Sequence, residues 1–343
     1  MSLRMAISAA MEGSEVPGPI LETAFAEIMD GKASDAQMAG LLIALRCKGE
    51  TVGEIVTAAK ALRSRAVMAE GVDPNAIDTC GTGGDGAQTF NISTTAAFVV
   101  AGAGVPVAKH GNRAASSKSG SVDVLESLGV RVDLAVEESA RILAQVGIVT
   151  FFAPRAHPAM KMIAPVRREL GVRTLMNCLG PLLNPAGVRL QLVGVYAAEL
   201  VEPLAEALGE LGAIRALVVH GSDGLDEITT RGRTDAVLLA DGVASPISIN
   251  PASLGFPPPL QGALRGGTAE ENAVIVRSLL EGESGARRDI VLLNAAAAIW
   301  VAGVAESLEE GIELARRSID SGAARERLAM LIAASGAGAD VGQ

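Results

Sequence analysis

A glycine-rich loop with the spacing of an anion-binding site occupies residues 81–86 (GTGGDG), directly after the strand-like segment AIDTC. It satisfies the G-x-G-x-x-G pattern of dinucleotide-binding folds. That class of fold also requires an acidic residue about 20 positions later, which holds the ribose hydroxyls. Residues 87–122 contain no Asp or Glu. The sequence therefore argues against a dinucleotide site and leaves a loop whose backbone could approach a phosphate closely.

The acid-free stretch that follows this loop carries the groups of a polyphosphate site. Lys109, His110, Arg113 and Lys118 accompany many Ser and Thr hydroxyls, in a chain that is acidic overall. Ammonium groups, hydroxyls and backbone amides together bind polyanions. A glycine-rich turn followed by a polar surface loop is the alternative interpretation. The segment KHGN follows the buried run VVAGAGVPVA, and ligand crevices of parallel sheets lie at strand ends, which favours the binding site.

Adjacent carboxylates, Asp226 and Glu227, come just after the strand-like segment ALVVHGSDG. Carboxylate oxygens are hard ligands of the kind that Mg²⁺ prefers. The alternative is a solvated surface pair or the start of a helix. Mg²⁺ usually keeps several waters and needs one or two carboxylates plus substrate phosphates, so a magnesium site requires no larger protein cage.

Composition excludes several classes of function. The chain has 343 residues, with 29 Lys plus Arg against 39 Asp plus Glu, so 29 − 39 gives a net charge of −10. This charge and an aromatic content of 2% argue against nucleic-acid binding and against attraction to anionic membranes. Three widely spaced cysteines without a CxxC motif indicate a reducing compartment, so a cytoplasmic location is expected. The apolar segment 290–305 contains Asn294 and is too short to span a bilayer, which predicts a buried helix.

The pattern of elements changes at about residue 76. Residues 20–70 show helical periodicity, with Gly31 and Gly49 where helices should stop and Ser34 and Thr51 where the next should start. From about residue 76, short apolar runs end in glycine: AIDTCGTGG, FVVAGAGVPVAKHG, ALVVHGSDG and DAVLLADG. Such runs, separated by helical stretches, predict a largely parallel sheet.

These patterns predict an α/β protein with a small N-terminal α-helical domain and a large α/β domain around a central, largely parallel sheet. We expect the helical domain to cover residues 1–72 and the α/β domain residues 73–343. The segment from about 158 to 182 is again helical and unusually basic, and we expect it to pack back on the N-terminal helices.

Six motifs, in order along most of the chain, resemble the anthranilate phosphoribosyltransferase family. They are GTGGDG, NIST at 91–94, KHGNRAASSKSGSVDVLESLG from 109, HPAMK at 157–161, VRRELGVRTLMNCLGPLLNP at 166–185 and GSDGLDEIT at 221–229. The resemblance implies transfer of the phosphoribosyl group from phosphoribosyl diphosphate to the amine of anthranilate, in tryptophan biosynthesis. It also implies a homodimer formed through the helical part and a fold shared with the pyrimidine nucleoside phosphorylases.

The resemblance assigns roles to residues of three kinds. The implied donor site consists of Gly81, Gly84, Asp85, Thr89, Asn91, Ile92, Ser93, Thr94, Lys109, His110, Gly111, Asn112, Arg113, Ala114, Ala115, Ser116, Ser117 and Ser121. The implied anthranilate site consists of Gly81, Asn112 and Arg167, and the implied Mg²⁺ ligands are Ser93, Asp226 and Glu227. Lys109 and His110 are the implied catalytic residues. Simple helix capping is the alternative role for Ser93 and Thr94, and a solvated surface position is the alternative for Arg167.

The implied reaction passes through a transition state of oxocarbenium character, so the charge of the departing diphosphate must be stabilised early. No carboxylate nucleophile and no strong general base are required, because the attacking amine is neutral. The first rival interpretation is a pyrimidine nucleoside phosphorylase of the same fold. The second is a catalytically silent member of the fold that acts as a scaffold or binds nucleic acid.

Overall fold

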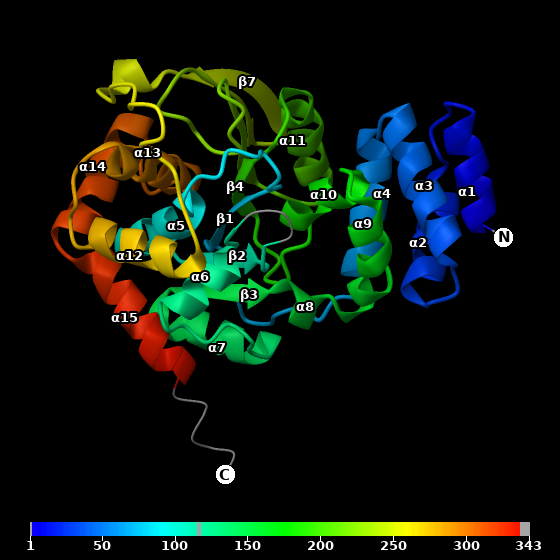
Figure 1. Ribbon diagram of the computed structural model, residues 1–343, viewed down its shortest axis with the longest axis horizontal. Helices are drawn as coiled ribbons and strands as arrows, with labels where there is room; N and C mark the ends of the chain where they lie inside the picture. The colour runs from blue at the N-terminus through cyan, green and yellow to red at the C-terminus, as the bar shows by residue number, and fades with distance from the viewer. Residues whose placement is uncertain (1, 115–117, 337–343) are drawn as a thin grey trace, which may run out of the picture.

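The computed structural model describes residues 2–114 and 118–336 of the chain. Four antiparallel helices form an N-terminal bundle that stands beside the α/β part (Figure 1). They are α1 (Ser2–Met11), α2 (Gly18–Met29), α3 (Asp35–Lys48) and α4 (Val52–Arg63). Ser34 and Thr51 form capping boxes at the starts of α3 and α4, and Gly49 caps the end of α3. The predicted helix boundaries are therefore confirmed.

A seven-stranded sheet forms the centre of the α/β part, in the order β3-β2-β1-β4-β5-β6-β7. The strands are β1 (Ile77–Gly81), β2 (Val107–Gly111), β3 (Ile148–Phe152), β4 (Leu190–Gly194), β5 (Arg215–Gly221), β6 (Thr234–Ala240) and β7 (Val243–Ile249). The neighbouring strands β3, β2, β1, β4 and β5 pair in parallel. Strands β6 and β7 extend this sheet with antiparallel pairings, β5 to β6 and β6 to β7. The predicted fold class is confirmed.

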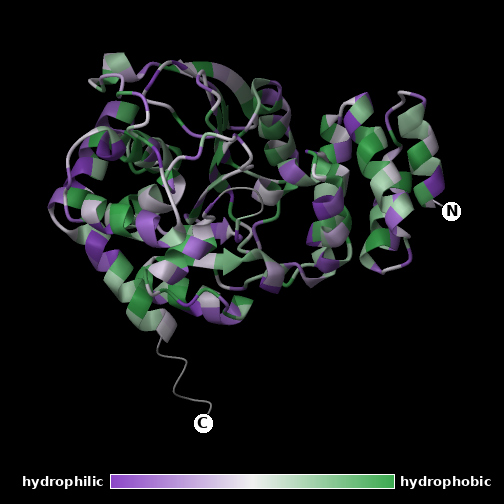
Figure 2. Cartoon of the chain, in the orientation of Figure 1, coloured by the Kyte–Doolittle hydropathy of each residue, from purple (hydrophilic) through white to green (hydrophobic). Residues whose placement is uncertain are grey.

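Helices cover both faces of this sheet (Figure 1). The helices after the N-terminal bundle are α5 (Ile92–Gly102), α6 (Ser121–Ser127), α7 (Val136–Val146), α8 (Ala153–Ala156), α9 (Ala164–Leu170), α10 (Leu175–Leu179), α11 (Val201–Glu210), α12 (Ala269–Leu280), α13 (Ala286–Val301), α14 (Leu308–Asp320) and α15 (Ala323–Gly336). Short 3-10 turns lie at Pro158–Met162, Gly180–Leu182, Ala198–Leu200 and Pro251–Leu254. Most helices show mixed bands of hydrophobic and hydrophilic residues, as expected for helices with one buried face (Figure 2).

One predicted element differs from the structure. The run FVVAGAGVPVAKHG is not a single strand, because its first part, FVVAG, completes helix α5 and only Val107–Gly111 forms β2. A continuous apolar run reads the same in a buried helix and in a buried strand, and α5 is buried on nearly all sides. The break falls at Gly104, which has a positive φ of 94°.

Two apolar cores stabilise the molecule. The larger packs α5, α13 and α15 against one face of the sheet, and α13 is buried along most of its length, as the sequence predicts. The second joins the N-terminal bundle to α9, α10 and α11 and to the other face of the sheet. The basic segment 158–182 contacts α2, α3 and α4 within this second core. In the described part of the chain, no helix is long and apolar enough to cross a membrane.

Candidate active site

The glycine loop and the acidic loop meet at the carboxyl ends of β1 and β4. Gly81 and Gly194 pair in register as the last residues of these strands. The loop that carries Asp226 crosses directly over both, and the Oδ2 atom of Asp226 accepts a hydrogen bond of 2.8 Å from the N–H of Gly83. A Cβ atom on Gly194 would lie 1.6 Å from the carbonyl oxygen of Asp226. Glycine at this strand end is thus required for the close approach of the two loops.

The start of α5 joins the same group. The backbone N–H of Ser93 donates to Oε1 of Glu227 at 3.0 Å, and Nζ of Lys109 lies 3.3 Å from Oγ of Ser93. Lys109 is only 3% exposed, and its Nζ also donates to the carbonyl of Thr79 in β1. Three chemical groups from β2, α5 and the acidic loop therefore converge, although 134 residues separate Ser93 from Glu227.

The acidic loop holds carboxylates in an environment that disfavours their charge. Burial, together with the nearby Asp85, raises the pKa of Asp226 to about 7. Burial also raises the pKa of Glu227 to about 8, with a contribution from Asp226, while Lys109 opposes the shift. Crowded carboxylates of this kind are stabilised by a bound cation.

The donor set fits Mg²⁺. Asp226 and Glu227 supply hard oxygens, and Ser93 offers a hydroxyl beside them. The described residues contain no cluster of three or more His, Cys, Asp or Glu side chains that could hold a metal. Two carboxylates without a further protein cage match the usual magnesium site that relies on waters and on substrate phosphates.

His110 is held as a neutral imidazole at the end of β2. Its Nδ1 donates to the carbonyl of Gly180 at 3.0 Å, and its backbone N–H donates to Oδ1 of Asp78 at 3.2 Å. The ring packs edge-on against His157, with centroids 5.2 Å apart. Burial lowers the pKa of His110 to about 3, with a further contribution from His157. The ring is thus neutral and only weakly basic at neutral pH.

Replacement of His110 by Ala is expected to reduce turnover only moderately, about tenfold, because a weakly basic neutral imidazole supplies less than a strong general base would. The wild-type rate should show no inflection from this group between pH 6 and 8.

The stability of the fold should also depend on His110. Since the folded pKa of His110 lies below the ordinary value of 6.5, the unfolded chain binds more protons between pH 6.5 and the folded pKa. Wild-type stability should therefore fall as the pH drops from 6.5 towards 3, and the Ala variant should lose less, which thermal unfolding against pH measures. A total loss of activity in a folded Ala variant would contradict this role.

Of the residues 109–121 that the sequence singles out, the structure describes 109–114 and 118–121, and among these Lys109, His110 and Gly111 belong to β2 while Ser121 begins α6. Oγ of Ser121 donates to the carbonyl of Asn112 at 3.3 Å, and the Asn112 side chain accepts from the N–H of Arg113 at 2.8 Å. The N–H of Ala114 donates to Asp123. Gly111 is tightly enclosed, because a Cβ there would lie 2.8 Å from Oγ of Ser121. Ala115, Ser116 and Ser117 lie outside the described residues.

Arg113 has a carboxylate partner within the protein, whereas Arg167 has none among the described residues. The Arg113 guanidinium forms an ion pair with Glu126 at 2.5 Å, so it is already engaged within the protein. Arg167, on α9, is half-buried, and its guanidinium has no carboxylate partner in the described part of the chain. Burial lowers the pKa of Arg167. A half-buried cation without an internal partner is suited to an external carboxylate.

The remaining predicted donor residues take different places around the glycine loop. Gly84 has a positive φ of 80°, and Asp85 turns back to accept from the N–H of Ala87 at 3.1 Å. Thr89 pairs with Arg265 in an isolated bridge. Ile92 and Thr94 are buried in the first turn of α5, and they support the loop rather than expose side chains to a ligand.

Several residues that the sequence did not single out hold this site together. Asp78, fully buried in β1, accepts from the amide of Asn184 at 2.8 Å as well as from His110. Arg173 donates to the carbonyl of Gly84 and stacks on Tyr196, with its guanidinium carbon 4.3 Å from the ring centroid. These partners lie far apart in the chain, so no local pattern could have paired them.

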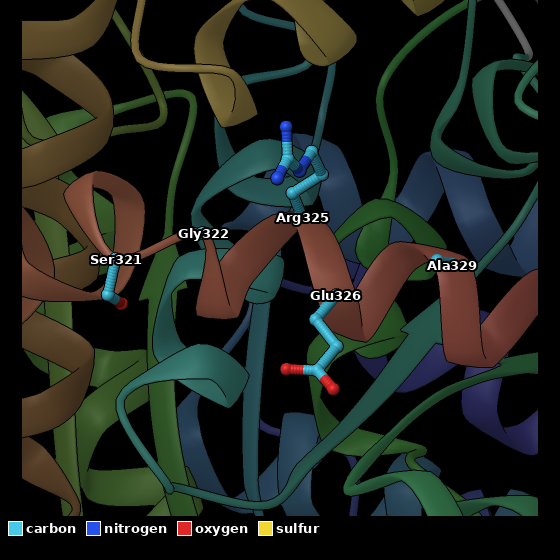
Figure 3. A pocket seen from close by; sticks show the side chains of 5 residues that line it. All are labelled: Ser321, Gly322, Arg325, Glu326 and Ala329. Atoms are coloured by element: carbon cyan, nitrogen blue, oxygen red, sulfur yellow. The ribbon is translucent and has the colours of Figure 1, made fainter.

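A hollow lies away from these groups, where α14 joins α15 (Figure 3). It is lined by Ser321, Gly322, Arg325, Glu326 and Ala329. Arg325 and Glu326 point to opposite sides of α15, so their charges do not converge on a common ligand (Figure 3).

Comparison with known proteins agrees with this geometry. The "Glycosyl transferase family, a/b domain" matches residues 73–325, and the "Glycosyl transferase family, helical bundle domain" matches residues 6–66. The fold and the site are thus those of a two-part glycosyl transferase.

Comparison with individual proteins identifies the family within the glycosyl transferases. The anthranilate phosphoribosyltransferase of Rhodospirillum rubrum is 56% identical over 314 residues, covering 92% of this chain and 90% of its own. That of Symbiobacterium thermophilum is 54% identical over 317 residues, covering 92% and 93%. A solved anthranilate phosphoribosyltransferase from Thermus thermophilus has a TM-score of 0.90 at 42% identity and covers 96% of this chain and 99% of its own. One from Saccharomyces cerevisiae, in complex with PRPP and Mg, has a TM-score of 0.89 at 27% identity, with 98% of both chains covered. The chain belongs to the anthranilate phosphoribosyltransferase family, as the sequence motifs predict.

Proposed function

We propose that the chain transfers the 5-phosphoribosyl group of phosphoribosyl diphosphate to the amine of anthranilate. The observation that carries the proposal is the convergence of Lys109, Ser93 and Glu227 beside the glycine loop. This arrangement offers a cation, a hydroxyl and carboxylates to a ligand that combines phosphates with a metal ion. Membership of the family supports the same reaction.

In this proposal the donor lies over the glycine loop and the start of α5. The backbone at Gly81 and Gly84 allows close approach of the diphosphate, and the first turn of α5 favours negative charge. Lys109 acts as a point charge near the departing diphosphate. Gly111, Asn112, Arg113, Ala114 and Ser121 are proposed to complete the donor site.

Mg²⁺ would be held by Asp226 and Glu227, with Ser93 beside them. When bound, it would neutralise part of the diphosphate charge. The two carboxylates have raised pKa values in the protein alone, which supports a site that is completed by a cation.

The acceptor is proposed to be oriented by Arg167, which would bind its carboxylate, and by Asn112. The amine nitrogen then forms a bond to the anomeric carbon while the bond from that carbon to the diphosphate oxygen breaks. The diphosphate leaves with the electron pair, and the nitrogen afterwards releases its proton to solvent or to the weakly basic His110. Catalysis therefore depends mainly on positioning and electrostatics.

Replacement of Arg167 by Ala should raise KM for anthranilate about 100-fold, because a charge-assisted pair of hydrogen bonds is lost. KM for phosphoribosyl diphosphate should change little. Steady-state kinetics with each substrate varied in turn measure both values. The neighbouring Arg168 is exposed, so Arg168→Ala is the matched control and should leave both KM values near wild type. An equal rise in both KM values for Arg167→Ala would contradict the assigned role.

We also propose a cytoplasmic homodimer that associates through the N-terminal bundle. Met5 and Met11 on α1 are 50% and 75% exposed, which leaves apolar surface on the bundle for a second copy. Sedimentation equilibrium of the purified chain would give twice the mass of 34.9 kDa if this is right.

The fluorescence of anthranilate itself provides the test of the activity. Purified protein, phosphoribosyl diphosphate and Mg²⁺ should together cause a decay that omission of the donor or addition of EDTA abolishes. A folded protein without such a decay, but with phosphate-dependent cleavage of uridine, would instead establish the pyrimidine nucleoside phosphorylase reading.

A further inference from the structure

A buried asparagine on α12, Asn272, contacts Asn91, a residue of the proposed donor site. Asn272 is 2% exposed, and its Nδ2 donates to Oδ1 of Asn91 at 2.9 Å. At its other end, Oδ1 of Asn272 accepts from the N–H of Gly267 at 2.8 Å. The backbone at this end is fixed by the capping box of Thr268 and Glu271. Since an N–H can only donate, the orientation of the Asn272 carboxamide is determined by Gly267.

This contact determines which way the carboxamide of Asn91 is oriented. Asparagine is a preferred N-cap residue, and Asn91 stands at the N-cap of α5. Its side chain nevertheless makes no capping hydrogen bond to the described residues of α5, because its oxygen accepts from Asn272. Its Nδ2 is directed instead to the carbonyl of Ser119 at 3.3 Å, in the turn before α6. The Asn91 side chain therefore directs its Nδ2 towards the carbonyl of Ser119 and its Oδ1 towards α12.

We infer that Asn272 is a positioning residue for the phosphoribosyl donor. It holds Asn91 in the one amide orientation that offers N–H groups, rather than an oxygen, to a polyanion. It also keeps the Asn91 oxygen away from the first turn of α5, whose N–H groups favour negative charge. This inference rests on the proposed function, in which Asn91 contacts phosphoribosyl diphosphate.

The substitution Asn272→Asp tests the inference with a minimal change. The carboxylate still accepts from Gly267 but can no longer donate to Asn91. Two oxygens then face one another, so Asn91 must rotate and turn its oxygen towards Ser119 and the donor. We expect the Kd for phosphoribosyl diphosphate with Mg²⁺, measured by calorimetry without anthranilate, to rise at least about tenfold. KM for anthranilate should stay within about twofold, and kcat within about threefold.

Two controls separate this role from a merely structural one. Val276→Ala on the same helix truncates a fully buried side chain of the larger apolar core, and it should leave the donor Kd unchanged. In an Asn91→Ala background, Asn272→Asp should add less than about twofold, because the effect acts through Asn91. Asn272→Ser, which is too short to reach Asn91, is the second variant if the Asp variant fails to fold.

Three results would overturn the inference. They are an unchanged donor Kd in a folded Asn272 variant, an equal rise in KM for both substrates, and a full effect that persists without Asn91. Failure of the proposed function has a different signature, since the wild-type protein would then neither bind phosphoribosyl diphosphate nor consume anthranilate.

Discussion

Replacement of Lys109 by Met is expected to lower kcat by two to three orders of magnitude. A preorganised donor at a developing charge contributes about 100-fold to 1,000-fold to turnover in comparable sites. Lys109 is almost fully buried and reaches Ser93 and Thr79 at the proposed position of the departing diphosphate. Initial rates of anthranilate consumption at saturating substrates measure the loss.

The Lys109 experiment has a matched control in Lys161→Met. Lys161 is exposed on the basic segment that packs on the N-terminal bundle, and its replacement should leave kcat near wild type. Thermal unfolding of both variants establishes that they are folded. A folded Lys109→Met variant that keeps more than about one tenth of the wild-type kcat would show that leaving-group stabilisation comes from elsewhere.

Replacement of Gly194 by Ala is expected to reduce kcat/KM at least about 100-fold. The new Cβ would lie 1.6 Å from the carbonyl oxygen and 2.4 Å from the carbonyl carbon of Asp226. Backbone rather than a flexible side chain occupies this space, so the acidic loop must move by about 1 Å or more. A displacement of that size costs about 100-fold in a positioned active site. Overpacking should also destabilise the fold by about 1–3 kcal/mol.

The matched control for Gly194→Ala is Gly209→Ala, in helix α11. There a Cβ would meet only the flexible end of Leu239, at 3.3 Å, and alanine favours the helix. This variant should retain its activity and Mg²⁺ requirement. If Gly194→Ala has the activity and Mg²⁺ requirement of the wild type, then the acidic loop does not depend on its approach to β4.

The motifs predicted the fold, and they allow a site to be proposed, because each motif is local. Ser34 and Thr51 indicate helix starts because their capping hydrogen bonds involve only the next three residues. The glycine loop and the KHGN segment each follow a strand, and parallel strands bring their carboxyl ends to one edge of the sheet. Asp226 and Glu227 likewise follow a strand-like segment closely.

Pairings between distant segments could not be predicted in this way. Asn272 meets Asn91 across 181 positions, and Asn184 meets Asp78 across 106. Each of these side chains is an ordinary polar residue in its own segment, and only tertiary packing gives it a partner. The same limit explains the run FVVAGAG, because burial on all sides removes the periodicity that separates a helix from a strand.

The stoichiometry of the reaction tests the central claim most directly. Phosphorus NMR of a mixture of protein, phosphoribosyl diphosphate, anthranilate and Mg²⁺ follows the release of diphosphate, while fluorescence follows the loss of anthranilate. Transfer to the amine predicts one diphosphate released for each anthranilate consumed, and no release when anthranilate is omitted. Diphosphate release at the same rate without anthranilate, or no release from the folded protein, would contradict the account.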